Sequence, residues 1–297
     1  MSYIQSSTPA TRKQPLPKPP KADKHWPIDV DFWRNYEVVK ELGSGFYGTT
    51  YLVTRLSDGT LFALKIYRRP ANAVNTFIQP PENNVEVQVL KQLGAECPWF
   101  VKYEQSLTLL DPRDFQWKQA VLQEYMPGGS LEDRKENLTR SDLVNVARQL
   151  LTQLACMHGA GLLHRDIKPD NVLYDGQRAV LIDYGLVCRL QANAYDKVPD
   201  CQQETRGHAE YMAPESTTGQ TEATDIWSLG VMLWYLLHPQ RPDTAVPTSL
   251  EQVPSYAAQV AKSIAAHPSK DSFDRLLKRM TDIDPDRRPT ALKALLE

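Results

Sequence analysis

The sequence predicts an α+β fold in two lobes: a five-stranded antiparallel sheet with one main helix, followed by a mostly helical lobe. Short alternating segments rich in β-branched and aromatic residues occupy the first part of the chain. From residue 141 onward, apolar residues recur at helical spacing instead. The 297 residues allow one two-lobed domain or two ordinary ones.

The elements of the first lobe follow from local patterns and turn residues. The predicted strands cover residues 36–42, 50–54, 60–67, 101–110 and 117–124, with a helix at about 83–93. Asp58-Gly59 supplies the turn between the second and third strands. Residues 68–81 contain three prolines and are expected to form a loop.

The helical lobe begins near Ser141. Apolar residues lie on one helical face at Leu143, Val146, Ala147, Leu150, Leu151 and Leu154, with an aspartate in the first turn. Further helices are expected at roughly 224–237, 250–266, 272–281 and 289–297.

Residues 1–30 are rich in Ser, Thr, Pro and Lys, and the proline run at 15–20 excludes helix and inner strand. We expect a disordered tail. It acts either as a bare linker or as a polyproline ligand for a partner with an aromatic-lined groove. Trp26 and Trp33 near its end are expected to pin it to the body.

Composition excludes several classes of function. The chain has 34 basic and 36 acidic side chains, so no global field directs it to nucleic acid or anionic membrane. No apolar run has the length of a membrane span, and the first thirty residues lack the features of a secretory signal. These observations favour a cytoplasmic, intracellular protein, and they leave delivery to another cell open.

The four cysteines, Cys97, Cys156, Cys188 and Cys201, form no Cys-x-x-Cys pair and do not cluster with histidine. The spacing favours isolated thiols in a reducing compartment, rather than a zinc site.

The most informative stretches are residues 164–171 and 183–185. They place Asp166, Lys168, Asn171 and Asp183 on two short turns that a β-hairpin would bring together. Phosphoryl transfer needs a carboxylate that accepts the hydroxyl proton, ligands that hold magnesium against a triphosphate, and a fixed cation. We assign Asp166 as the base, Lys168 as the cation, and Asn171 and Asp183 as the metal ligands.

Three strings in order and spacing resemble the eukaryotic-type protein kinases: His-Arg-Asp-Ile-Lys-Pro-Asp-Asn at 164–171, Asp-Tyr-Gly at 183–185 and Ala-Pro-Glu at 213–215. Lys168 resembles the serine/threonine branch. The resemblance runs from about Tyr36 to the C-terminus. It implies a kinase domain at 31–297, with a small lobe at about 36–124, a hinge at 124–129 and a large lobe at about 130–297.

The same resemblance implies ATP- and Mg²⁺-dependent transfer of the γ-phosphoryl group to serine or threonine hydroxyls of protein substrates. The alternatives are a pseudokinase that acts as a scaffold, and a small-molecule kinase of related fold, which the Ala-Pro-Glu string disfavours. A pseudokinase usually lacks a key lysine or aspartate. Here Lys65, Asp166, Asn171 and Asp183 are all present.

For the nucleotide, the glycine-rich stretch at 43–48 lies between two predicted strands, so its glycines let backbone amides approach phosphates. A dinucleotide fold would instead place a helix after it. In the family, a lysine placed like Lys65 contacts the α- and β-phosphates and pairs with a helix glutamate, here Glu86 or, as the alternative, Glu82. The resemblance assigns the remaining cofactor contacts to Gly43, Gly45, Gly48, Ala63, Gln123, Glu124, Met126 and Leu173.

Some residues are implied to be structural, and others depart from the family. Asp225 would brace the catalytic loop, and Glu215 would pair with Arg288. Gln123 would narrow the back of the nucleotide pocket or bond Glu86.

Tyr184 replaces a usual phenylalanine, and Thr50 replaces a usual valine. His208 replaces a usual threonine, and it either bonds Asp166 or points outward. Arg165 is expected to pair with Glu204, or with a phosphate on Thr205.

Overall fold

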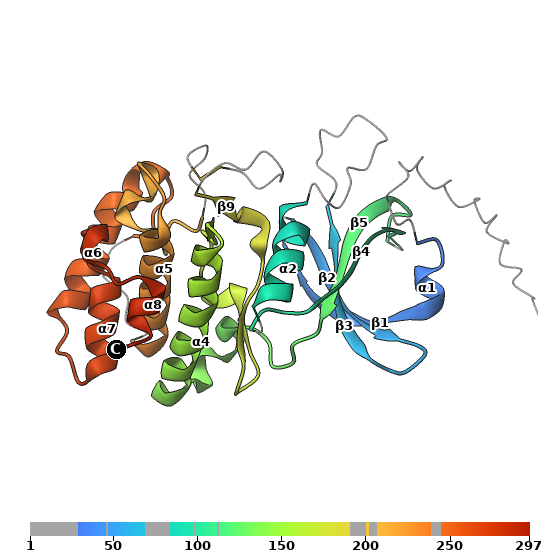
Figure 1. The fold of residues 1–297 in the computed structure, drawn as a ribbon, viewed down its shortest axis with the longest axis horizontal. Helices are drawn as coiled ribbons and strands as arrows, with labels where there is room; N and C mark the ends of the chain where they lie inside the picture. Colours follow the sequence, from blue (N-terminus) through green and yellow to red (C-terminus); the bar gives the residue numbers. More distant parts are fainter. Residues whose placement is uncertain are drawn as a thin grey trace, which may run out of the picture.

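The computed structural model describes residues 29–45, 47–68, 84–97, 99–111, 113–190, 200–201, 207–238 and 245–297. These residues form a sheet-and-helix lobe and a mostly helical lobe lying end to end along the long axis (Figure 1). The predicted fold class is confirmed. Nearly all of the expected tail and the loop at 68–81 lie outside the described residues.

The sheet is antiparallel throughout, in the order β1-β2-β3-β5-β4. Its strands are β1 (Tyr36–Ser44), β2 (Gly48–Arg55), β3 (Leu61–Tyr67), β4 (Tyr103–Leu110) and β5 (Trp117–Glu124). β3 is the middle strand, and Lys65 lies on it between Thr50 of β2 and Val121 of β5. Because β3 is hydrogen-bonded to a strand on each side, the backbone that carries Lys65 is fixed in place.

Helix α2 (Val85–Glu96) begins where Asn84 caps it. The Asn84 side chain accepts hydrogen bonds from the backbone amides of Glu86 and Val87. The helix therefore starts two residues later than predicted, with Glu86 in its first turn. Its buried residues Leu90 and Leu93 join the core that extends into the helical lobe.

A short helix not predicted from the sequence, α1 (Phe32–Asn35), precedes β1. Phe32 is fully buried and stacks on Tyr36 with ring centroids 4.5 Å apart. The indole nitrogen of Trp33 donates a hydrogen bond to the Leu110 carbonyl at 2.7 Å. Trp33 thus pins the start of the domain to β4 as expected, whereas Trp26 lies outside the described residues.

The helical lobe is built around α5, which is buried on almost every face. Its α-helices are α3 (Leu131–Arg134), α4 (Arg140–Gly159), α5 (Glu222–Leu237), α6 (Val253–Ala266), α7 (Ser272–Met280) and α8 (Ala291–Ala294). The 3-10 helices are η2 (Lys135–Asn137), η3 (Pro169–Asn171), η4 (Tyr184–Leu186), η5 (Pro214–Thr217), η6 (Leu250–Gln252) and η7 (Pro285–Arg287). The short strands are β6 (Leu162–Leu163), β7 (Val172–Tyr174), β8 (Ala179–Leu181) and β9 (Cys188–Arg189).

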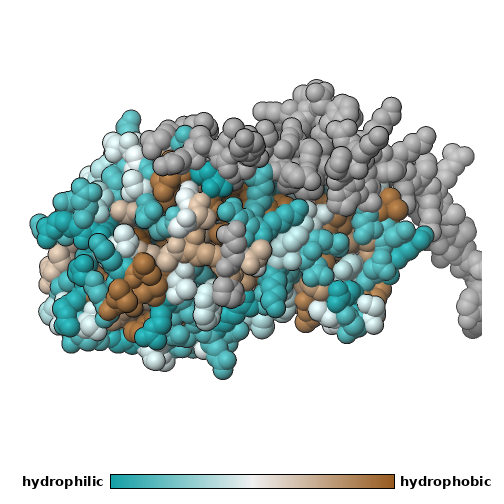
Figure 2. Space-filling model, in the orientation of Figure 1, coloured by the Kyte–Doolittle hydropathy of each residue, from teal (hydrophilic) through white to brown (hydrophobic). Residues whose placement is uncertain are grey.

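The face shown in Figure 2 is mainly hydrophilic, with apolar side chains over the C-terminal helices at the left and over parts of the sheet lobe at the right. Leu292 on α8 and Leu296 just after it are exposed. In the part of the chain that the structure describes, no helix combines the length and apolar character needed to cross a membrane.

The cysteines are paired, so the expectation of isolated thiols is wrong in this structure. One disulfide joins Cys97 at the end of α2 to Cys156 on α4, and the other joins Cys188 on β9 to Cys201. The first pair is 59 residues apart in sequence and the second is 13 apart. Sequence spacing could not reveal these pairs, because the tertiary fold brings the partners together.

A buried ion pair anchors η5 to the C-terminal region, as expected. The guanidinium of Arg288 donates two hydrogen bonds to the Glu215 carboxylate, at 2.5 and 2.9 Å. Arg288 also donates to the carbonyls of Asp282 and Ala223, and it lies over the Trp227 ring. Because its side chain is wholly buried, Arg288 depends on these partners to offset its lost hydration.

We predict that denatured, unreduced protein has no free thiol and that reduction releases four. Thiol titration with and without reductant measures this directly. Reduction should also lower the unfolding free energy, by about 4 kcal/mol for the longer loop on a chain-entropy basis. Four reactive thiols before reduction would contradict the pairing.

We predict that Glu215→Gln destabilises the fold by roughly 3–5 kcal/mol, because it leaves the buried Arg288 charge without a carboxylate. Chemical denaturation measures the loss. Glu132→Gln is the matched control, since the Glu132–Lys135 pair on the surface should contribute little. Equal stability of the two variants would contradict the assignment.

Candidate active site

The loop that carries Asp166 is fixed by Asp225, a buried residue of α5. Its carboxylate accepts hydrogen bonds from the backbone amides of His164 and Arg165, both at 2.9 Å, and lies 3.0 Å from the His158 imidazole. Burial alone would raise the pKa of Asp225, but the bonds from His158 and the Arg165 amide hold that pKa below its usual value. The expected brace is confirmed, and the loop backbone is set just before Asp166.

Arg165 joins the catalytic loop to the segment after Asp183. It has a left-handed backbone (φ 68°), which is uncommon for a residue other than glycine. Its guanidinium donates to the Leu186 carbonyl at 2.6 Å and to Gln220 at 3.1 Å. Its expected partners Glu204 and Thr205 lie outside the described residues.

Asp166 is a buried carboxylate with three polar neighbours. The Asn171 amide donates to its Oδ2 atom at 2.8 Å, the His208 Nδ1 atom lies 2.7 Å from Oδ1, and the Lys168 Nζ atom lies 3.3 Å from Oδ2. Burial would raise the pKa of Asp166, but the His208 bond and the Lys168 charge lower it to about 2. Asp166 is therefore ionised at neutral pH and can accept a further hydrogen bond.

The hairpin expected from the sequence brings Asn171 and Asp183 together. β7 pairs with β8 in a register that sets Val172 opposite Leu181, and the Ile182 amide donates to the Asn171 carbonyl at 2.9 Å. Asp183 follows directly, with a left-handed backbone (φ 66°). The Asn171 bonds to Asp166 use its amide nitrogen, so its side-chain oxygen takes no part in them.

Lys65 lies between two carboxylates. Its Nζ atom donates to both Glu86 oxygens, at 2.7 and 2.9 Å, and to the Asp183 Oδ1 atom at 3.0 Å. Burial alone would lower the pKa of Lys65, but these two charges raise it above its ordinary value. Glu86 is thus the partner of Lys65, and the alternative Glu82 lies outside the described residues.

The predicted glycines have different surroundings. A Cβ atom at Gly48 would lie 2.4 Å from the Ile66 carbonyl oxygen, so only glycine fits against β3. Apart from its chain neighbours, no described residue has an atom within 4 Å of a Cβ built at Gly43 or Gly45. The Gly45 amide donates to the Gly48 carbonyl across the turn. Open backbone at these two glycines is what close approach of a phosphate requires.

The residues assigned to adenine lie along β3, β5 and β7. Ala63 pairs with Gln123 across the sheet, and Met126 is buried beyond the end of β5. Among the described residues, the buried side-chain oxygen of Gln123 has no hydrogen-bond partner. Within the described part of the chain, the structure shows no bond from Gln123 to Glu86. Leu173 is half-buried on β7.

The side chain of Glu124 is held by hydrogen bonds within the protein. Arg178 donates to both of its carboxylate oxygens, at 2.6 and 3.2 Å, and the Lys102 amide donates at 3.1 Å. The Glu124 amide donates to the Lys102 carbonyl at 2.9 Å, so neither this amide nor the carboxylate is left for a ligand. Sequence reasoning missed Arg178, because no local pattern links residues 54 positions apart.

Sequence reasoning also missed Tyr67. Its ring lies 5.5 Å from the Lys65 Nζ atom. Burial raises the pKa of its hydroxyl, and the nearby Glu86 charge adds to the shift. The alternation of a strand could have found it, because residues 65 and 67 share one face of β3.

The two side chains assigned to magnesium supply oxygen ligands of the kind that Mg²⁺ prefers. In the described residues, no three His, Cys, Asp or Glu side chains gather in a metal-binding cluster. One carboxylate and one amide fit an ion that completes its shell with water and substrate phosphates.

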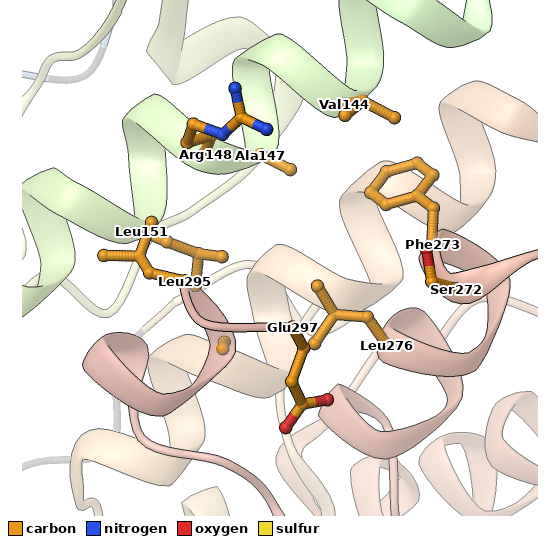
Figure 3. A pocket seen from close by; sticks show the side chains of 10 residues that line it. Val144, Ala147, Arg148, Leu151, Ser272, Phe273, Leu276, Leu295 and Glu297 are labelled. Atoms are coloured by element: carbon orange, nitrogen blue, oxygen red, sulfur yellow. The ribbon is translucent and has the colours of Figure 1, made fainter.

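A separate hollow lies in the helical lobe between α4, α7 and the C-terminal end (Figure 3). Apolar side chains such as Val144, Leu151, Phe273 and Leu276 line it, with Arg148 at one side. None of the residues assigned to catalysis or nucleotide binding contributes to it.

Comparison with known proteins gives the class of this fold and site. A model of the protein kinase domain matches residues 36–297. The chain therefore belongs to the protein kinase family.

Two relatives show how similar this chain is in sequence to known protein kinases. The chain is 28% identical over 283 residues to calcium-dependent protein kinase 14 of Arabidopsis thaliana, covering 91% of this chain and 50% of that protein. It is 27% identical over 310 residues to serine/threonine-protein kinase H1 of Homo sapiens, covering 96% and 67% respectively. The chain thus spans about half to two thirds of the length of these relatives.

Proposed function

We propose that this chain is an active serine/threonine protein kinase, which transfers the γ-phosphoryl group of ATP to hydroxyls of protein substrates. The observation that supports this most is Asp166: a buried, ionised carboxylate, beside Lys168 and bonded to Asn171. A scaffold without activity would have no need to keep these groups converged.

In the proposed reaction, Asp166 accepts the proton of the acceptor hydroxyl. The hydroxyl oxygen bonds to the γ-phosphorus while the bond from that phosphorus to the bridging oxygen breaks, and ADP leaves. Lys168, 3.3 Å from Asp166, supplies positive charge next to the base.

Asn171 and Asp183 would hold magnesium, which when bound neutralises charge on the phosphates. Lys65, oriented by Glu86, would bind the α- and β-phosphates, and Gly43, Gly45 and Gly48 would form the turn beside them. Ala63 and Leu173 would flank adenine, next to Gln123. Adenine would hydrogen-bond the Glu124 carbonyl and the Met126 backbone.

We further propose that residues 31–297 form the kinase domain, with its hinge at 124–129. Lys168 and the name of the human relative, serine/threonine-protein kinase H1, support serine and threonine as acceptors. A cytoplasmic location fits the need for ATP. Disulfides persist mainly in oxidising compartments, so the state of the cysteines in cells tests that location. Free thiols that an alkylating agent traps in cells would support the cytoplasm, and intact disulfides would contradict it.

The decisive experiment incubates the purified chain with radiolabelled ATP, Mg²⁺ and a generic protein mixture, followed by phosphoamino-acid analysis. Label on phosphoserine or phosphothreonine supports the proposal. Label on phosphotyrosine alone would overturn the acceptor class. Nucleotide binding without any transfer would favour the pseudokinase.

We predict that Asp166→Ala and Asp183→Ala both lower turnover by at least about 100-fold, for different reasons. Asp166→Ala removes the proton acceptor and should largely retain Mg²⁺-dependent nucleotide binding. Asp183→Ala removes a metal ligand and should weaken that binding. Turnover and nucleotide titration separate the two, with the exposed Arg34→Ala as the control. Full turnover in either aspartate variant would remove its assignment.

A further inference from the structure

The glycine-rich turn at 43–48 is held by a chain of hydrogen bonds that starts in the turn between β4 and β5. The Arg113 guanidinium donates to the Thr49 hydroxyl at 3.0 Å, and the Thr49 and Ser44 hydroxyls lie 3.0 Å apart. Arg68 donates to the same Ser44 oxygen at 3.1 Å. Because Ser44 lies within the glycine-rich turn, this chain of bonds reaches the turn itself.

The two arginines decide how the hydroxyls are used. A guanidinium only donates hydrogen bonds, so Thr49 accepts from Arg113 and Ser44 accepts from Arg68. Each hydroxyl keeps its own proton, and one of these protons makes the bond between Ser44 and Thr49. Thr49 is almost fully buried, and a bond from a charged donor is stronger than one between neutral groups. The bond from Arg113 to Thr49 is therefore the main link in the chain.

Arg113 is itself fixed by Asp111, whose side chain is fully buried. The guanidinium donates to the two Asp111 oxygens at 3.0 and 2.7 Å, and Lys118 donates to the same carboxylate at 2.8 Å. Burial would raise the pKa of Asp111, but the bonds from Arg113 and Lys118 lower it to about 2. The carboxylate is thus ionised at neutral pH, and the two-pronged pair keeps the guanidinium aimed at Thr49.

The chain of bonds lies on the face of the sheet opposite to Lys65. Ser44 and Thr49 are partners in the β1–β2 register and share one face. Tyr51 follows on that face, packs in the apolar cluster of the small lobe, and has its ring centroid 5.3 Å from the Arg113 guanidinium. Thr50, which is paired with Lys65, points to the other face. An effect of Arg113 on a nucleotide beside Lys65 must therefore pass through the backbone of the turn.

We propose that Arg113 is a positioning residue: anchored by Asp111, it holds the glycine-rich turn through Thr49 and Ser44 in the form that binds nucleotide phosphates. This inference rests on the proposed function, which sets the turn beside the phosphates. Glycine loses more conformational freedom on becoming fixed than any other residue. A turn that is fixed in advance therefore binds at a smaller entropic cost. The gain concerns the phosphates, and neither the base nor the chemical step.

The first test titrates wild type and Arg113→Ala with ATP and Mg²⁺, and separately with adenosine, which has no phosphate. The Kd for ATP should rise about tenfold in the variant, as expected for the loss of one hydrogen bond from a charged donor. The Kd for adenosine should not change. In turnover assays, KM for ATP should rise while kcat is kept.

Arg55→Ala is the matched control for this titration. Arg55 makes the same two-pronged pair with Asp58, but at the opposite end of β2 from the glycine-rich turn. This variant should bind ATP as wild type does. An unchanged Kd for ATP in Arg113→Ala, or an equal rise for adenosine, would overturn the proposal.

The second test asks whether Arg113 acts through the Thr49 hydroxyl. Thr49→Val removes the hydroxyl and keeps the branched shape, so it should weaken ATP binding as Arg113→Ala does. Thr49→Ser keeps the hydroxyl and should bind ATP as wild type does. The double variant Arg113→Ala/Thr49→Val should bind no more weakly than either single variant, because both remove the same bond. Additive losses would overturn the route through Thr49.

The third test needs neither nucleotide nor activity. Amide hydrogen exchange at residues 43–49 should be faster in Arg113→Ala than in wild type, because the bond from the Gly45 amide to the Gly48 carbonyl lasts only while the turn is closed. Exchange in the β2–β3 turn at 56–60 should not change. Equal exchange of the glycine-rich turn in both proteins would overturn this proposal, even if wild type transfers phosphoryl groups. Faster exchange in the variant of a protein that transfers none would support it and remove the proposed function instead.

Discussion

The site depends first on one carboxylate that takes no part in the proposed chemistry. Asp225 accepts the amides of His164 and Arg165 and contacts His158, inside a core that excludes water. An unpartnered charge there would be costly, so these bonds and the loop conformation must form together. The loop in turn aims Asp166, and Arg165 reaches from it to the segment that follows Asp183.

A second constraint joins the two lobes. Lys65 from the sheet, Glu86 from α2 and Asp183 from the end of the β7–β8 hairpin meet at one ammonium group. The position of α2 and that of the proposed metal ligand are therefore coupled through Lys65. Movement of α2 would change both, which is how an ion pair of this kind can serve as a switch.

Most of this fold and site could be predicted because the information is local. Alternation on β5 gave its bounds correctly, and the spacing between Asn171 and Asp183 was enough to predict a hairpin. The features that could not be predicted depend mainly on residues that are far apart in the sequence and close only in the folded structure. The disulfide partners and the Arg178–Glu124 pair lie far apart in the chain, and α1 has only four residues, too few for a period to show. The roles of Gln123 and His208 stayed open because side-chain direction is not encoded in spacing.

The disulfide at the end of α2 has a mechanical consequence. Cys97 fastens that end of the helix to α4, while Glu86 lies a full helix length away in the first turn. Because the disulfide holds the C-terminal end of α2, the helix can move mainly by rotating about Cys97. A displacement of Glu86 is then a rotation of the helix about that end. Reduction of this disulfide would also allow α2 to shift along α4, held by its packing and by the Glu86–Lys65 pair.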